Sequence, residues 1–239
     1  MSTQPNQSEL RVENLSMVYH TEDGQDVHAI EDINFNMDEG NLVVVVGPSG
    51  CGKTTLLNTV AGFLAPTGGR ILLNGEVIER PGAERGVVFQ KGALFEWLTV
   101  YENAVFGLKM RGVDEDKRHE RVMNYLDLVG LTDFVDTPIY NLSGGMQQRV
   151  AIVRCLANNP SILLMDEPLG ALDALTREKM QTLILKIWKE TGKGVFFITH
   201  SVEEAIFLAT DLFVMSARPG KIMKRSKLDF CHKGLDKDP

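Results

Sequence analysis

An apolar β-branched run that passes directly into a glycine-rich loop restricts the fold of this chain more than any other feature. Residues 41–47 read NLVVVVG, which is typical of a strand buried on both faces of a parallel sheet. The loop that follows, GPSGCGKTT at 47–55, leads into sequence that predicts a helix from Lys53 to about Leu64. This strand, loop and helix predict one unit of a parallel α/β core.

The glycine-rich loop fits the pattern G-x-x-x-x-G-K-[ST], the phosphate-binding P-loop. Glycines let the backbone curl so that N–H groups point at phosphates, and the positive end of the helix adds to them. Lys53 supplies a mobile charge, and the Thr54 hydroxyl can ligate Mg²⁺. The sequence therefore predicts a nucleotide site made of Gly47, Pro48, Ser49, Gly50, Cys51, Gly52, Lys53, Thr54 and Thr55.

Other strands and helices can be predicted from residue periodicity. Residues 9–19 and 28–37 alternate apolar and polar side chains, as half-buried strands do, and 69–78 predict a hairpin around an Asn-Gly turn. SILLMDEP at 161–168 and GVFFITH at 194–200 predict further buried strands, each followed by a helix. From about Lys91 to Pro160 the strand signal disappears. In this stretch, one helical face is predicted to carry Val122, Tyr125, Leu126 and Val129.

These elements predict an α/β fold in one domain spanning 9–226. Its parts are a RecA-like P-loop core with a parallel sheet and an N-terminal antiparallel β region, at 9–90 and 160–226. An α-helical subdomain is predicted as an insertion at about 91–159. Residues 227–239 are expected to form a short polar tail.

Composition excludes several classes of protein. The formal net charge of -7 argues against broad nucleic-acid binding, which requires a basic face. Cys51, Cys155 and Cys231 show neither metal-ligand spacing nor a disulfide framework, which fits a reducing cytoplasm. The polar N-terminus predicts no secretory signal, and no apolar run approaches the roughly 20 residues of a membrane span. A connection with a membrane is therefore expected only through a partner.

Two adjacent carboxylates end the predicted strand at 161–168. Ligands of an open parallel sheet bind at the carboxyl ends of its strands. Asp166 is therefore predicted to hold Mg²⁺, and Glu167, one residue further, to orient and deprotonate an attacking water. The alternative is a pair of solvated acids that open a loop.

A second candidate anion site, NLSGGMQQRV at 141–150, has a serine cap and two glycines before a helix but no lysine. Here the sequence resembles the ATP-binding subunit of ABC transporters, whose signature is usually LSGGQ followed by a basic residue. The resemblance covers about Leu10 to Lys224, and its elements come in the family's order. Besides the P-loop and signature they are Tyr19, Gln90 in VVFQ, the Asp166–Glu167 pair, Ala171 to Asp173 in ALD, and His200 in FFITHS.

The resemblance implies a composite ATP site in a homodimer. Ser143, Gly144 and Gly145 of one copy would cap the γ-phosphate of ATP held by the P-loop of the other, whose Lys53 supplies the charge. Tyr19 would stack on adenine, Gln90 would touch Mg²⁺ or the attacking water, and His200 would contact the γ-phosphate. The family's D-loop matches the segment that ends at Asp173. Catalysis is thus assigned to Glu167, His200, Gln90 and Lys53, and Mg²⁺ binding to Thr54, Gln90 and Asp166.

Simpler interpretations of these residues stay open. Tyr19 could be ordinary strand packing, Gln90 a surface amide, His200 a buried histidine bonded to backbone, and LSGG an ordinary helix cap. Arg149 could hold the signature helix or be a solvated charge. Met146 stands where the family commonly has Gln, GALD replaces the commoner SALD, and Ser201 follows the histidine where Asp is frequent. None of these departures removes a group that acts on phosphate, so an active ATPase is expected.

The same resemblance implies a role in transport. Two copies with two Mg·ATP would drive integral membrane permease subunits from the cytoplasmic side of the inner membrane, with an extracytoplasmic substrate-binding protein as an indirect partner. The segment after Gln90, with apolar Leu94, Phe95, Trp97 and Leu98, is expected to form the groove for the permease. PGAERGVVFQ, LSGGMQQR and SARPGKI resemble the nitrate, sulfonate, taurine and bicarbonate importers, which implies import of a small oxyanion or organosulfur compound.

Alternatives to this function remain at the level of the sequence. KGALF at 91–95 resembles lipid-trafficking members of the superfamily, so an export or lipid-trafficking ATPase is one alternative. A soluble ABC protein that acts on ribosomes or DNA is another, although such proteins typically carry two cassettes or a long coiled-coil insertion. A regulatory module that binds nucleotide without hydrolysis is the third, and Glu167 and His200 argue against it.

Overall fold

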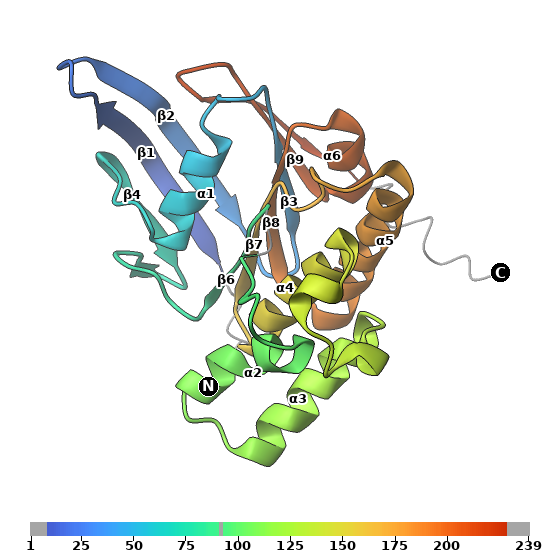
Figure 1. The fold of residues 1–239 in the computed structure, drawn as a ribbon. Helices are drawn as coiled ribbons and strands as arrows, with labels where there is room; N and C mark the ends of the chain where they lie inside the picture. Colours follow the sequence, from blue (N-terminus) through green and yellow to red (C-terminus); the bar gives the residue numbers. More distant parts are fainter. Residues whose placement is uncertain (1–8, 91–92, 229–239) are drawn as a thin grey trace, which may run out of the picture. The chain divides into compact units, whose positions relative to one another are not determined.

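The structure, a computed structural model, describes residues 9–90 and 93–228 and divides into two compact units (Figure 1). Unit 1 combines the chain up to Gly82 with the chain from Gly192 onward, and unit 2 is Ala83–Thr191. Cys231, the predicted subdomain boundary at residue 91 and the tail from residue 229 lie outside the described residues.

Unit 1 contains an antiparallel sheet of four strands in the order β2-β1-β4-β5. Its strands are β1 (Leu10–His20), β2 (Asp26–Met37), β4 (Gly68–Leu73) and β5 (Glu76–Val77). Asn74 and Gly75 join β4 to β5 with φ of 56° and 83°, the left-handed conformation that this pair of residues favours in tight hairpins. The predicted half-buried strands and the Asn-Gly hairpin are confirmed.

The other strands of unit 1 surround β3 (Leu42–Val46). This strand is buried at every residue and lies between β8 (Gly194–Thr199) and β9 (Asp211–Met215), parallel to both. β10 (Ile222–Lys227) pairs with β9 in the antiparallel sense. A core of aromatic side chains links these strands to β2: the Phe35 ring stacks on Phe196 at 5.7 Å between centroids and meets Phe213 edge-on at 5.3 Å.

Two helices of unit 1 pack on these strands. α1 (Lys53–Ala61) contacts β2 and β8, and α6 (Val202–Leu208) contacts β3 and β8. The predicted end of the first helix near Leu64 was wrong by three residues. Gly62 takes a left-handed φ of 81°, and the Phe63 and Leu64 N–H groups turn back to donate to Asn58 O at 2.9 and 3.3 Å, which closes the helix at Ala61.

Unit 2 contains a parallel pair of strands and four α-helices within its described residues. The strands are β6 (Arg85–Val88) and β7 (Ile162–Asp166). The helices are α2 (Val100–Met110), α3 (Glu115–Leu128), α4 (Gly144–Ala157) and α5 (Ala174–Thr191), and 3₁₀ turns lie at Thr132–Phe134 and Ile139–Asn141. α2, α3 and α4 pack against one another, as Figure 1 shows.

The predicted helical face in unit 2 is confirmed for most of its members. Val122 and Leu126 of α3 are fully buried, while Tyr125 is half-buried. Val129 is also buried but caps the helix, one residue beyond its end. β6 has no counterpart among the predicted strands, because four residues with a glycine give too short a signal.

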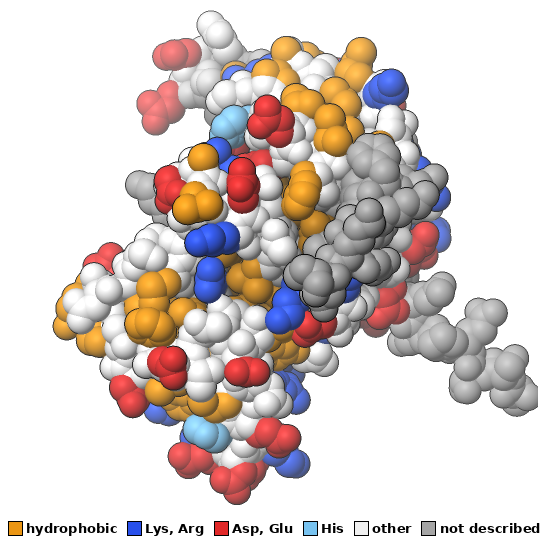
Figure 2. All heavy atoms as spheres, turned by 90° about the vertical axis from the view of Figure 1, so that its right-hand side faces the viewer, with side chains coloured by type: hydrophobic (Ala, Val, Ile, Leu, Met, Phe, Trp, Pro, Cys, Tyr) orange, Lys and Arg blue, Asp and Glu red, His pale blue; other side chains and the backbone are white. Residues whose placement is uncertain are grey.

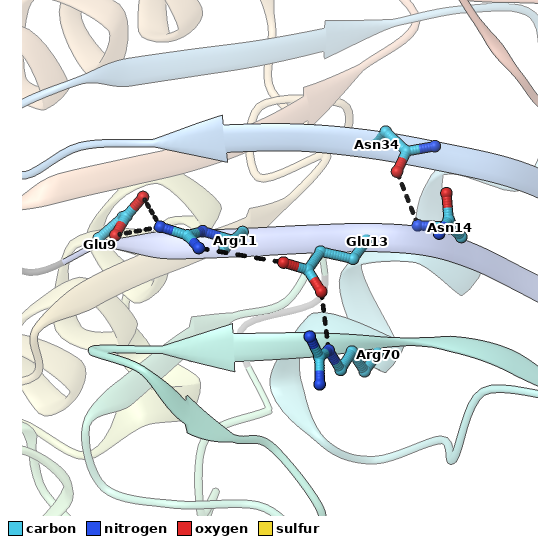
Figure 3. A network of polar contacts seen from close by, with 6 residues as sticks. All are labelled: Glu9, Arg11, Glu13, Asn14, Asn34 and Arg70. Atoms are coloured by element: carbon cyan, nitrogen blue, oxygen red, sulfur yellow. Dashed lines mark hydrogen bonds and ion pairs between the residues drawn. The ribbon is translucent and has the colours of Figure 1, made fainter.

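Charged side chains line the first residues of β1 (Figure 3). Arg11 pairs with Glu9 at 3.0 Å and approaches Glu13 at 4.0 Å, and Arg70 of β4 donates to Glu13 at 2.7 Å. Exposed ion pairs of this kind add little to stability but keep the outer face of the sheet polar. On the face of the molecule shown in Figure 2, acidic, basic and hydrophobic side chains are interspersed. None of the helices within residues 9–90 and 93–228 has the length and apolarity that a bilayer crossing requires.

Candidate functional site

The P-loop of unit 1 connects the buried end of β3 with the start of α1. Gly50 and Gly52 have φ of 75° and 101°, a region that other residues rarely adopt. A Cβ on Gly52 would lie 2.6 Å from Ala29 O, and one on Gly47 would lie 2.9 Å from Cys51 Sγ. The loop can therefore curl against its surroundings only because these positions lack side chains.

Lys53 lies against the backbone of the same loop. Its side chain is almost fully buried, and its ammonium donates to Gly47 O at 2.9 Å and to Pro48 O at 3.0 Å. Lys53 is also the first residue of α1, where the leading N–H groups lack acceptors within the helix. A positive charge and a helix N-terminus at one glycine loop favour a bound phosphate.

Unit 1 brings two further predicted residues to this region. The Tyr19 hydroxyl lies 3.4 Å from Thr55 Oγ1 and forms a hydrogen bond with it, while the residue remains 39% exposed. An aromatic ring with an accessible surface beside the P-loop could stack on a base. Stacking of Tyr19 on a base and ordinary strand packing are both compatible with this contact, so the role of Tyr19 stays a prediction.

His200 leaves the sheet at the same edge as the P-loop. Val46 and Thr199 are register partners in the neighbouring strands β3 and β8, so Gly47 and His200 both follow the paired ends. His200 is exposed, which excludes the simpler interpretation of a buried histidine. The turn around it is held by Thr199, whose hydroxyl donates to Glu204 Oε2 at 2.6 Å and accepts from the Ser201 N–H at 3.0 Å.

Unit 2 places the other acidic and amide candidates together in the same way. Val88 of β6 and Met165 of β7 are register partners, so Gln90 and the Asp166–Glu167 pair follow the carboxyl ends of adjacent parallel strands. Glu167 has a φ of 43°, unusual for a residue with a side chain. Such strain, of about 1–3 kcal/mol, is concentrated at functional sites, which supports the assignment of Glu167.

The predicted signature forms the start of α4. Ser143 is the N-cap, and its hydroxyl oxygen accepts from the Met146 N–H at 3.3 Å, so the helix-cap interpretation of LSGG is confirmed as a structural role. The bond uses a lone pair of the hydroxyl, whose proton can still be donated. Gly144 is exposed, whereas a Cβ on Gly145 would lie 2.6 Å from Thr176 Cγ2.

Three side chains after Met146 hold this helix start in place. Gln147 donates to Ile139 O at 3.1 Å, and Gln148 donates to Phe89 O at 3.3 Å. Arg149 donates to Val129 O at 3.1 Å, so it supports the signature helix rather than being only a solvated charge. Gln148 was not among the predicted residues, although it is buried and ties α4 to the residue before Gln90. A glutamine inside a helix gives no sequence signal for such a contact.

Asp173 has a visible structural role at the start of α5. Its carboxylate accepts from the Thr176 N–H at 3.0 Å. Hydrogen bonds from the Thr176 side chain and backbone hold the pKa of Asp173 below its ordinary value. The carboxylate therefore stays charged at an exposed position.

A pocket of about 780 Å³ lies within unit 2, beside Gln90. Leu94, Tyr140, Gln147 and Leu172 are among its lining residues, and Tyr140 is 70% exposed. Trp97 nearby in sequence is 78% exposed. Of the apolar residues predicted there, Phe95 packs on Phe106 with 4.6 Å between ring centroids and is half-buried.

Asn103, fully buried in α2, fastens this segment. Its amide donates to Phe95 O at 3.1 Å and Thr99 O at 3.0 Å, and its oxygen accepts from the Phe95 N–H at 2.9 Å. Asn103 was not among the predicted residues, because one asparagine in a helix does not reveal which loop it contacts.

The residues predicted to bind Mg²⁺ offer suitable donors. Thr54 presents an exposed hydroxyl at the start of α1 in unit 1. Gln90 and Asp166, in unit 2, present an amide and a carboxylate oxygen after paired strands. Each of these oxygen ligands is of the hard type that Mg²⁺ prefers.

Comparison with known proteins gives concordant results. The family described as ABC transporter matches residues 30–170. The taurine import ATP-binding protein TauB of Pelagibacter ubique (strain HTCC1062) is 60% identical over 231 residues, which are 97% of this chain and 87% of that protein. The protein of the same name in Burkholderia pseudomallei (strain 1710b) is 52% identical over 97% of this chain and 89% of its own length.

Solved structures agree with these sequence relatives. The dimeric structure of MJ0796, a bacterial ABC transporter cassette, has a TM-score of 0.80 at 32% identity and covers 92% of this chain and 98% of that one. CbiO1 from Clostridium perfringens, part of the ABC transporter complex cbiONQ, has a TM-score of 0.81 at 31% identity. The match covers 91% of this chain and 88% of that one. The predicted resemblance and the predicted fold class are confirmed.

Proposed function

The chain belongs to the ABC transporter family, and on this premise we propose that it is the ATP-hydrolysing subunit of a taurine importer. The observation that carries the substrate is the 60% identity, over 97% of this chain, to a taurine import ATP-binding protein. This narrows the oxyanion and organosulfur class expected from the sequence to an aminosulfonate. Relatives named for taurine import also favour import over the export or lipid-trafficking alternative.

The proposed nucleotide site starts from the P-loop. Backbone N–H groups from Gly50 to Thr55 and the Lys53 ammonium would bind the β- and γ-phosphates of ATP. To reach them, Lys53 would exchange its bonds to the two loop carbonyls for bonds to phosphate oxygens. Tyr19 would stack on the adenine. Mg²⁺, held by Thr54, Gln90 and Asp166, would neutralise phosphate charge when bound.

Hydrolysis is assigned to Glu167, His200 and Gln90, together with the Lys53 ammonium on the phosphates. Glu167 would orient a water and take its proton as the oxygen attacks the γ-phosphorus. The bond between the γ-phosphorus and the bridging oxygen would break, leaving ADP and inorganic phosphate. His200 would donate to the γ-phosphate oxygens, and Gln90 would contact the attacking water. The MJ0796 cassette has also been solved as a dimer in a post-hydrolysis state bound to ADP and Pi, at 32% identity and a TM-score of 0.80 to this chain, which supports this reaction class.

A second copy of the chain would complete each site. The hydroxyl of Ser143 and the N–H groups of Gly144 and Gly145 would cap the γ-phosphate held by the other copy, with Asp173 at the same interface. The exposure of Ser143 and Gly144, and the dimeric structure of a related cassette, support this arrangement. ATP would then hold two chains together until hydrolysis separates them.

The membrane partners belong to the same proposal. Permease subunits would contact unit 2 at the pocket beside Gln90, where Tyr140 offers exposed aromatic surface. Trp97, which follows the lining residue Glu96 in the sequence, is exposed as well. The subunit would thus be peripheral, at the cytoplasmic side of the inner membrane. A substrate-binding protein outside the membrane would deliver taurine to the permease.

Glu167→Gln tests the motor. This variant should bind ATP normally, dimerise when ATP is added, and turn over about 10²- to 10⁴-fold more slowly, because it lacks the base. Glu178→Gln, an exposed position on α5, is the matched control and should keep wild-type turnover. Phosphate release measures the turnover, and size-exclusion chromatography measures the ATP-dependent dimerisation, which also requires ATP binding. Normal turnover in Glu167→Gln would remove Glu167 from its role.

The substrate needs a separate test. The chain is reconstituted with its own permease and substrate-binding protein, and ATP hydrolysis is measured with taurine, nitrate or bicarbonate. Taurine should stimulate hydrolysis and the two inorganic anions should not. Stimulation by nitrate or bicarbonate without any response to taurine would contradict the proposed substrate.

A further inference from the structure

The loop Ser216–Lys221, SARPGK, connects β9 to β10 and has its own internal hydrogen bonds. The Ser216 N–H donates to Lys221 O at 2.9 Å, and the Lys221 N–H donates to Ser216 Oγ at 2.9 Å. The Ser216 hydroxyl in turn donates to Pro219 O at 2.9 Å. These three bonds define the shape of the loop from within.

This loop is anchored on β2 and lies against the P-loop. Gly220 donates to Ala29 O at 3.0 Å and accepts from the Glu31 N–H at 3.1 Å, and Lys221 pairs with Glu31 at 3.2 Å. Gly220 is buried, and a Cβ placed on it would lie 2.1 Å from Cys51 O. The backbones of the two loops are therefore in direct contact.

Arg218 extends from the anchored loop to the P-loop itself. Its Nη2 donates to Gly50 O at 3.2 Å. Gly50 is the residue whose φ of 75° starts the curl of the P-loop. Arg218 is exposed otherwise, so this contact is made at the surface and not forced by core packing.

We propose that Arg218 is a positioning residue for the P-loop, which fixes the Gly50–Cys51 peptide and increases nucleotide affinity by its charge. In a trans peptide the C=O and the next N–H point in opposite directions, so holding Gly50 O also holds the Cys51 N–H. The guanidinium stays charged at all relevant pH and attracts phosphates across a few ångströms. This inference rests on the proposed function, because it assumes that the loop binds nucleotide.

Binding of ADP to the full chain, measured by isothermal calorimetry, separates the two contributions. Arg218→Gln keeps a neutral donor and loses the charge, and its Kd for ADP should rise roughly three- to ten-fold. Arg218→Lys keeps the charge, so its Kd for ADP should lie between those of wild type and Arg218→Gln. Because salt screens charges, the gap between wild type and Arg218→Gln should narrow from 20 to 300 mM KCl. At saturating ATP, kcat should stay within about two-fold while KM follows the Kd.

Arg225→Gln is the control for a general loss of positive charge. Arg225 is also exposed and lies in β10 of the same unit, where its guanidinium is 5.3 Å from the Phe213 ring centroid. The Arg225→Gln variant should bind ADP with the affinity of the wild-type chain.

Equal affinities of wild type and Arg218→Gln would overturn the inference. It would also be overturned by a lower kcat at unchanged KM, or by an equal loss in Arg218→Gln and Arg218→Lys that does not depend on salt. Failure of the wild-type chain to bind ADP or ATP would instead contradict the proposed function. Arg218→Lys does not depend on the stability of Arg218→Gln, so the lysine variant keeps the test decisive.

Discussion

Replacing Gly145 by Ala tests how tightly the signature helix packs on α5. The added Cβ would lie 2.6 Å from Thr176 Cγ2, whereas carbon atoms pack at about 3.5–4.0 Å. The two groups must therefore separate by about 1 Å, and the branched Thr176 side chain has few alternative rotamers. Overpacking of this kind costs about 1–3 kcal/mol, against a gain of up to about 1 kcal/mol for Ala over Gly in a helix. Gly145→Ala should lower the free energy of unfolding by about 1–2 kcal/mol.

Thr176→Ser identifies the cause. Serine lacks the clashing methyl but keeps the hydroxyl that hydrogen-bonds to Asp173. In a Thr176→Ser background, Gly145→Ala should be neutral or stabilise by up to about 1 kcal/mol, so the sign of its effect changes. Urea denaturation of the four chains, in one buffer without nucleotide, gives the interaction energy directly.

Gly144→Ala is the matched control on the same helix turn. Its Cβ would meet only Leu172 Cδ2 at 3.8 Å, an ordinary contact, so its stability should stay within about 0.5 kcal/mol of wild type. The reasoning would be refuted if Gly145→Ala were as stable as wild type. It would be refuted equally if Gly145→Ala lowered the free energy of unfolding by the same amount in the wild-type and Thr176→Ser backgrounds.

Two further predictions concern buried polar groups. Asn103→Ala should lower the free energy of unfolding by about 2–3 kcal/mol in urea denaturation, because the partly buried backbone of Phe95 loses both of its partners on this side chain. The exposed Asn124→Ala on α3 should change stability by less than about 0.5 kcal/mol, and equal effects would contradict the assignment. Burial raises the pKa of the Cys155 thiol, which donates to Val87 O at 2.9 Å, from 9.0 to about 11. As pH rises, the thiol of the unfolded chain ionises before the buried thiol of the folded chain does. The contribution of Cys155 to the free energy of unfolding, about 3 kcal/mol, is therefore complete below pH 9 and is lost as pH rises towards 11. Stability measured at pH 8 and 10.5 should fall less in Cys155→Ala than in wild type, and parallel losses would contradict the burial of this thiol.

Local patterns account for most of the elements that were predicted correctly. The run LVVVV is buried on all sides as β3, and the Asn74–Gly75 pair turns the hairpin, because chain composition over a few residues decides such features. The end of α1 was missed although Gly62 was visible in the sequence, because the proline and glycines that follow gave a stronger stop signal. The catalytic and binding roles of Glu167, His200 and the signature stay predictions that the tests above address.

Contacts between distant residues account for what the sequence analysis missed. Arg218 is 168 residues from Gly50, Gln148 is 59 from Phe89, and Gly145 meets a methyl group on another helix. None of these pairs has a periodicity or spacing that a single chain reveals.

By itself, the sequence determined the glycine loop between β3 and α1, most of the strands and helices, and the family, since each depends on short segments whose geometry their own residues dictate. Only the tertiary structure decided which backbone each polar side chain supports and which glycines allow two segments to approach closely. The physical reason is that hydrogen bonds and steric limits act over a few ångströms, and packing alone determines which residues come that close.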